Sequence, residues 1–165
     1  MPPGAVAASA TAFAEAWNEN VTGTGVPPVR REDVVELDRG PNGRTFVAPL
    51  SDEVGLVAVV RDDGAVAQVL LAWIPGGDEE ASNRLYRDAF DVLVVTVNPA
   101  LTAPERGELA TALGLDASHP PFPAGERADA EAAPQRYARV IRDTQVSDET
   151  VVISVIDARP RSTAS

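Results

Sequence analysis

The chain has 165 residues, a formal net charge of −11, no cysteine and no lysine, and its one histidine is His119. This composition excludes disulfide bonds and thiolate metal sites. It also disfavours nucleic acid and anionic membrane surfaces as partners, because binding to either requires a basic face. An apolar fraction of 44% indicates a single globular domain over residues 1–165, with an ordered body from about residue 5 to residue 158.

An amphipathic helix is predicted at the amino-terminal end. Apolar residues recur at helical spacing from Val6 through Phe13 and Trp17 to Val21. Two glycines and a Pro-Pro pair follow, so residues 23–31 are predicted to form a loop.

Two β-hairpins come next. Residues 34–38 and 44–48 flank a Gly-Pro-Asn-Gly turn, and residues 56–61 and 65–74 flank an Asp-Asp-Gly turn. Both faces of the second hairpin are apolar, which is typical of strands covered on both sides, or covered by a partner on one side. Five residues are candidates for such an interface: Val57, Val59, Leu70, Ala72 and Ile74.

Two helices are predicted in the centre of the chain. The first is capped by Asp78 and continues to about Val97. The second has the strongest local signal in the sequence, since Thr102 and Glu105 have the spacing of a capping box and Gly114 follows as a stop.

Residues 116–134 show no clear periodicity and are predicted to be a long loop, in which 126–133 can form a short helix. Connections of this length are often binding loops or lids. A last hairpin is predicted from residues 136–142 and 150–157, followed by a frayed tail over 159–165.

The order of one helix, four strands, two helices and two strands predicts an α+β fold. We expect an antiparallel, meander-type sheet of about six strands with the helices on one face. If the sheet curves around the first helix, the two would enclose a cone-shaped cavity.

The sequence carries no nucleotide-binding, catalytic-triad or zinc-protease motif, so neither a metal nor a cofactor is expected. A mechanism that uses carboxylates alone has no characteristic spacing and stays open. Alternation along the last hairpin places Arg139 opposite to Arg136 and Arg142, so we expect three solvated arginines rather than one anion site.

Four side chains are candidate ligand-binding residues: Trp17, Trp73, His119 and Phe122. Each also has a simpler structural interpretation. The tryptophans suit the core, Phe122 can anchor the long loop, and His119 can be a solvated loop residue.

The leading hypothesis is a non-enzymatic binding or interaction module that associates with itself or with another protein through the apolar sheet face. The alternative is a small-ligand-binding protein or a carboxylate-dependent enzyme, with a pocket between sheet and helices under residues 116–134. A third interpretation, a chaperone or immunity-type protein for a basic partner, rests on net charge alone.

No run approaches the roughly 18 to 20 apolar residues of a membrane span, so membrane insertion is not expected. The protein is expected to be cytoplasmic if Met1 is its natural start, and extracytoplasmic if a leader has been removed.

Overall fold

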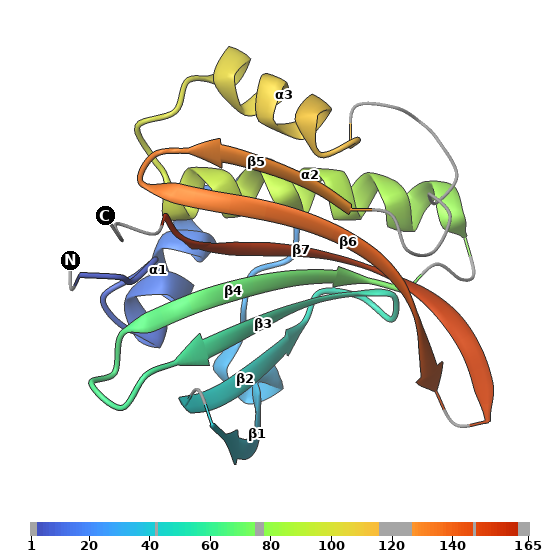
Figure 1. Cartoon of the computed structure of the whole chain (residues 1–165), viewed down its shortest axis with the longest axis horizontal. Coiled ribbons are helices and arrows are strands. Elements are labelled where there is room, and N and C mark those ends of the chain that lie inside the picture. Colours follow the sequence, from blue (N-terminus) through green and yellow to red (C-terminus); the bar gives the residue numbers. More distant parts are fainter. Residues whose placement is uncertain (1–2, 42, 75–77, 116–126, 147, 162–165) are drawn as a thin grey trace.

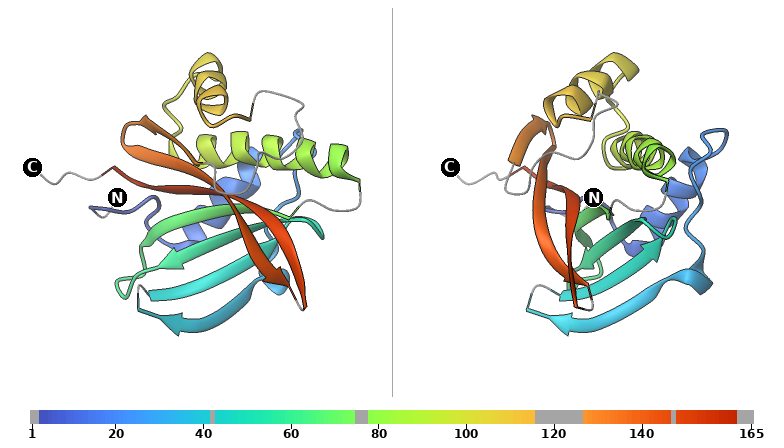
Figure 2. Two further views of the ribbon diagram at one scale, coloured as in Figure 1. Left: turned by 45° about the vertical axis from the view of Figure 1, so that its right-hand side comes forward. Right: turned by 90° about the vertical axis from the view of Figure 1, so that its right-hand side faces the viewer.

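The computed structural model describes residues 3–41, 43–74, 78–115, 127–146 and 148–161. Within them, three α-helices lie on one face of a seven-stranded antiparallel sheet (Figures 1 and 2). The helices are α1 (Ala10–Asn20), α2 (Glu79–Val97) and α3 (Ala103–Ala112), with a short 3-10 helix η1 (Arg31–Asp33). The strands are β1 (Val35–Gly40), β2 (Gly43–Pro49), β3 (Val54–Val60), β4 (Val66–Trp73), β5 (Arg127–Ala132), β6 (Gln135–Val146) and β7 (Glu149–Pro160). The α+β class and the positions of the helices in the element order are confirmed.

The described sheet has the strand order β1-β2-β3-β4-β7-β6-β5 and one more strand than the sequence predicts. The additional strand is β5, at the end of the segment predicted to be loop and short helix. Its alanines alternate with charged residues, and Ala128, Ala130 and Ala132 pack against the core. Alanine favours helices, but pairing with β6 along all six residues satisfies the backbone and buries one face.

The β6–β7 hairpin is longer than predicted, with twelve residues in each strand. The predicted tail therefore starts too early, because β7 extends to Pro160. Strand β4 pairs only with Ser154–Ala158 of β7, so the outer half of the hairpin extends beyond β4 and curves away from the body (Figure 1).

Helix α1 starts at Ala10, one turn later than the apolar spacing predicts. Ser9 is the N-cap, and its hydroxyl accepts a hydrogen bond from the Ala12 N–H at 3.0 Å. Val6 instead lies in an extended segment, where its N–H donates to the carbonyl of Val66 at 2.8 Å. Val6 is still buried, so its apolar character is explained by this strand-like contact rather than by a helix face.

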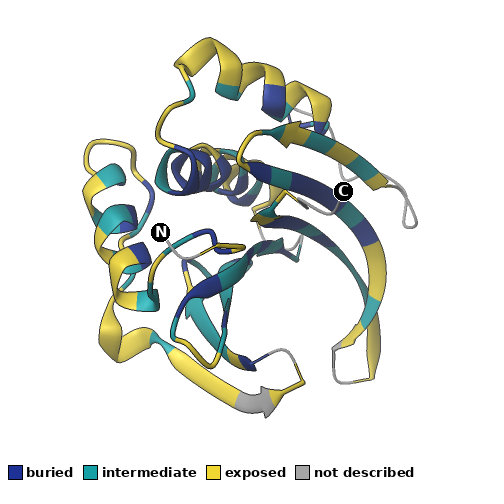
Figure 3. Ribbon diagram, turned by 60° about the vertical axis from the view of Figure 1, so that its left-hand side comes forward, coloured by how far each residue is buried: buried dark blue, intermediate teal, exposed yellow. Residues whose placement is uncertain are grey.

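The core lies between the inner face of the sheet and helices α1 and α2 (Figure 3). Helix α2 supplies Tyr86 and Leu93, both 0% exposed, and these meet Leu71 of β4 and Ile156 of β7, which are also 0% exposed. Burial of each large apolar side chain stabilises the fold by about 1.5–3 kcal/mol. The single layer of helices leaves the opposite face of the sheet without a covering helix in the described chain.

Helix α3 shows the predicted capping box. The Thr102 hydroxyl accepts from the Glu105 N–H at 3.4 Å, and the Glu105 carboxylate accepts from the Thr102 N–H at 2.7 Å. The helix ends with Gly114 at φ 72°, and Leu115 donates its N–H to the carbonyl of Ala110 at 2.8 Å. The cap directs Leu109 and Leu113 into the core.

We predict that Thr102→Ala lowers the free energy of unfolding by about 1 kcal/mol, because the Glu105 N–H loses its acceptor and the Glu105 carboxylate loses the hydroxyl donor. Thr102→Ser keeps the acceptor and should cost less than half of that. Thr111→Ala, on the exposed side of the same helix, is the control and should not destabilise. Urea unfolding followed by circular dichroism measures all three variants, and equal stability of Thr102→Ala and the wild type would contradict the role of the cap.

Candidate functional sites

The structure places both predicted tryptophans in the core. Trp17 is 0% exposed and Trp73 is 1% exposed. The indole N–H of Trp17 donates to the carbonyl of Pro27 at 3.1 Å, and that of Trp73 donates to the Ser82 hydroxyl at 3.0 Å. Each indole therefore fixes a neighbouring segment, and their role in ligand binding stays a prediction. His119 and Phe122 lie outside the described residues.

The five predicted interface residues gather on the side of the sheet that faces away from the helices. Val57 is the register partner of Leu70, and Ala72 is the partner of Val155, so all four share one face. All five, including Ile74, are partly exposed, whereas the alternating residues of β4, such as Leu71, are buried against the helices.

We name this side the outer sheet face and define it by its apolar residues: Val35, Leu37, Val47, Val57, Val59, Leu70, Ala72, Ile74, Ile153 and Val155. The register continues it to the sheet edge, since Val47 pairs with both Val57 and Val35. Val35 is 56% exposed and Leu37 48% exposed, and they are the exposed large apolar side chains of the described chain. Contiguous apolar surface of this kind is typical of an interaction site.

A charged cluster bounds the outer sheet face toward β5. Asp157 forms an ion pair with Arg159 and accepts a hydrogen bond from Gln68 at 2.8 Å. Arg127 donates to Asp129 at 2.9 Å. Because these charges pair with one another, the cluster forms a polar rim to the apolar area.

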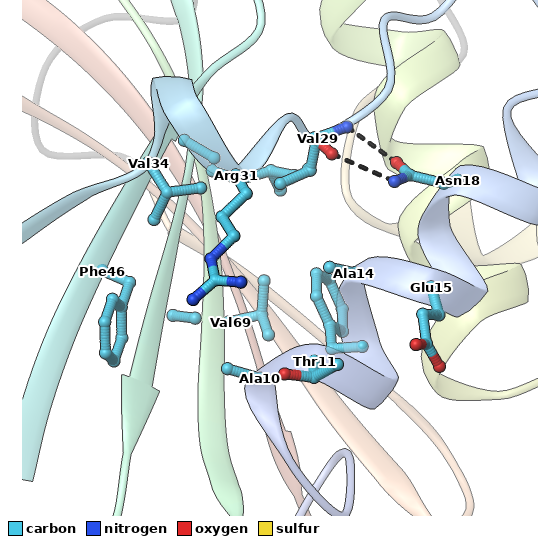
Figure 4. A pocket seen from close by; sticks show the side chains of 14 residues that line it. Ala10, Thr11, Ala14, Glu15, Asn18, Val29, Arg31, Val34, Phe46 and Val69 are labelled. Carbon is cyan, nitrogen blue, oxygen red and sulfur yellow. Dashed lines mark hydrogen bonds between the residues drawn. The ribbon is translucent and has the colours of Figure 1, made fainter.

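A second candidate site lies on the other side of the sheet. An open cavity of about 510 Å³, here called the α1 pocket, separates α1 from the inner face of β2, β3 and β4 (Figure 4). Its walls are largely apolar, with Ala10, Phe13 and Ala14 from the helix and Phe46, Leu56 and Val69 from the sheet. Ala10 and Ala14 of α1 and Ala58 of β3 line the pocket. The cavity stays open because these side chains are too small to fill it.

Hydrogen bonds hold the segment around Val29 against α1 at the rim of the α1 pocket. The Asn18 amide donates to the carbonyl of Val29 at 3.0 Å and accepts from its N–H at 2.7 Å (Figure 4). Together with the bond from Trp17 to Pro27, this pair ties the segment before η1 to α1. These bonds fix the position of this segment at the rim of the pocket. None of the described residues that line the pocket comes from 116–134, the segment under which the sequence analysis expects a pocket, so that expectation stays a prediction.

Two arginines lie close to the α1 pocket, and they differ in their partners. Arg44 donates to Glu36 at 2.7 and 3.0 Å, and its guanidinium lies 5.0 Å from the centroid of the Phe46 ring. This hydrogen bond raises the pKa of Arg44 and lowers that of Glu36. Arg31 lines the pocket and forms no ion pair or side-chain hydrogen bond with any described residue.

Arg139 is a correction to the sequence analysis, which predicts it to be solvated. It is 5% exposed, and its guanidinium donates to the Ser154 hydroxyl at 3.0 Å and to the carbonyl of Gly114 at 2.9 Å. The carbonyls at the end of α3 need donors, and a long side chain on the inner face of β6 supplies them. Strand alternation separates Arg139 from Arg136 and Arg142, but the sequence did not show that the Arg139 side of β6 lies under α3.

Tyr86 completes this buried cluster. Its hydroxyl lies 3.0 Å from the Ser154 hydroxyl, and its ring lies 5.8 Å from the Arg139 guanidinium. Burial raises the pKa of the phenol to about 12, against smaller opposing effects of Ser154 and Arg139. A phenol that keeps its proton in this way is a structural hydrogen-bonding group.

The described residues contain no group of three His, Cys, Asp or Glu side chains placed to hold a metal ion. None of the helices in the described part of the chain has the length and hydropathy needed to cross a membrane. Comparisons with protein-family models, with curated proteins and with solved structures found no match to this chain.

We predict that the folded protein forms little tyrosinate near pH 11. Both tyrosines of the chain are buried, and burial raises the pKa of Tyr137 as well as that of Tyr86. In the unfolded chain both phenols release their protons near pH 10, so stability is full below that pH and is lost as the pH rises toward about 12. Ultraviolet titration with and without urea measures this, and complete ionisation near pH 10 with the native circular dichroism retained would contradict it.

Proposed function

We propose that the protein is a non-enzymatic interaction module that associates with itself by packing the outer sheet faces of two copies against each other. The observation that supports this most is the outer sheet face itself, an apolar surface over five adjacent strands with no described helix above it. Sheets pack face to face about 10 Å apart through such residues.

The size of this surface fits a second copy of the chain. Five strands about 4.8 Å apart and about 23 Å long present on the order of 550 Å² in projection, and the corrugated accessible surface is larger. A stable interface buries about 600–1,000 Å² on each partner. A two-fold axis through the face would bring the same residues of both copies together, with Val57 and Leu70 near the centre because β3 and β4 lie inside the sheet.

Charge gives this association a distinctive salt dependence. Each copy has a net charge of −11, so two copies repel each other at long range. Apolar contact has to outweigh that repulsion, and added salt screens it. We therefore expect association to strengthen with ionic strength, in contrast to partners held together by opposite charges.

The proposal predicts a dimer in sedimentation velocity and a monomer for Val57→Arg. The arginine reduces the net negative charge and so weakens the long-range repulsion, which means that loss of the dimer must come from the charge buried in the interface. Ala112→Arg makes the same change of charge on the exposed side of α3 and serves as the matched control, which should remain dimeric. Circular dichroism confirms that each variant is folded.

A wild-type protein that sediments as a monomer at every concentration and salt would overturn the proposal. If the Val57→Arg variant dimerises as well as the control, the outer sheet face is not the dimer interface.

A further inference from the structure

The α1 pocket has three features of a ligand site that are independent of self-association. It is concave, it is mostly apolar, and its volume of about 510 Å³ lies in the range of small-molecule pockets. At the roughly 30 Å³ that one water occupies in the liquid, this volume holds on the order of 15 non-hydrogen atoms. Water in such a cavity finds few hydrogen-bond partners, so an apolar occupant replaces it favourably.

The polar groups of the pocket indicate what the other end of the ligand carries. Asn18 has both its amide groups engaged with Val29. Glu15 lies on α1 and points away from Arg31 (Figure 4). Arg31 points into the space between Phe46 and α1, so its guanidinium offers donors at the end of an apolar wall.

We propose that the α1 pocket binds a small amphiphile with an apolar body and one carboxylate, which Arg31 receives. A planar guanidinium matches a carboxylate with two parallel hydrogen bonds. The neighbouring Arg44 is already paired with Glu36, so a single cation serves the ligand. The overall charge of −11 acts against anions and acts twice as strongly against dianions, which favours a monocarboxylate over a phosphate ester.

The test uses three probes with the same ten-carbon chain: decanoate, decan-1-ol and decylamine, each below the concentration at which it forms micelles. Isothermal titration calorimetry should show that decanoate binds the wild-type protein about tenfold more tightly than decylamine, because only the carboxylate pairs with a guanidinium. Decan-1-ol tests the apolar wall without a charge.

Two arginine variants separate the pocket from general electrostatics. Arg31→Gln should weaken decanoate binding about tenfold and leave decan-1-ol within about twofold of the wild type. Arg30 is exposed like Arg31 but does not line the pocket, so Arg30→Gln removes the same charge and should change the binding of neither probe. Ala58→Leu fills the space from β3 and should weaken both probes about tenfold or more.

Several outcomes would overturn the proposal. If decanoate binds Arg31→Gln as well as it binds the wild type, the carboxylate has another partner or none. If none of the three probes binds, the α1 pocket is not a ligand site, because side chains of the protein itself fill it in solution. If Ala58→Leu binds decanoate normally, the ligand lies elsewhere. The dimer measurement is independent of each of these results, since the pocket and the outer sheet face lie on opposite sides of the sheet.

Discussion

The pairing of β4 with β7 holds the two halves of this protein together. It joins β1–β4, which are consecutive in the chain, to β5–β7, which follow two helices later. The ladder runs from Val69 opposite Ala158 to Trp73 opposite Ser154, and the inner side chains of both strands are buried. Buried backbone N–H and C=O groups cannot bond to water, so they have to pair across the ladder. This pairing fixes the orientation of β1–β4 relative to β5–β7 and of the helices that pack on them.

The chain between β4 and β7 accounts for the asymmetry of the molecule. Helix α2 crosses the inner face, and α3 packs beside β5, so the described helices all cover the same side. Asn98 at the end of α2 donates to the carbonyl of Ala132 at 3.0 Å, and Gln135 donates to the carbonyl of Val97 at 3.1 Å, which ties α2 to the β5–β6 turn. The opposite, partly apolar face of the sheet has no described helix above it.

The two candidate sites follow from different properties of the same strands. On the outer side, large β-branched and aliphatic residues such as Val57 and Leu70 lie in register and build a continuous surface. On the inner side, alanines such as Ala58 face the alanines of α1. These short side chains do not fill the space between sheet and helix, and the space that remains is the α1 pocket. Neither site needs a reactive residue, which agrees with a chain that has one histidine and no cysteine or lysine.

Local patterns in the sequence predict the hairpins of β1–β4 and the capped helices α2 and α3. They also predict that Val57 and Leu56 lie on opposite faces of β3. These features can be predicted because turns, caps and the two-residue period of a strand depend on residues close in the sequence. Four matters were settled only by tertiary contacts: the strand β5, the start of α1 after Val6, the burial of Arg139, and the position of Arg31 beside the apolar side chains of the α1 pocket. Val6 and Arg139 depend on partners far along the chain, Val66 and Gly114, whereas β5 takes its form from pairing with the neighbouring β6. Backbone pairing or a carbonyl that needs a donor then outweighs the local preference of the residue.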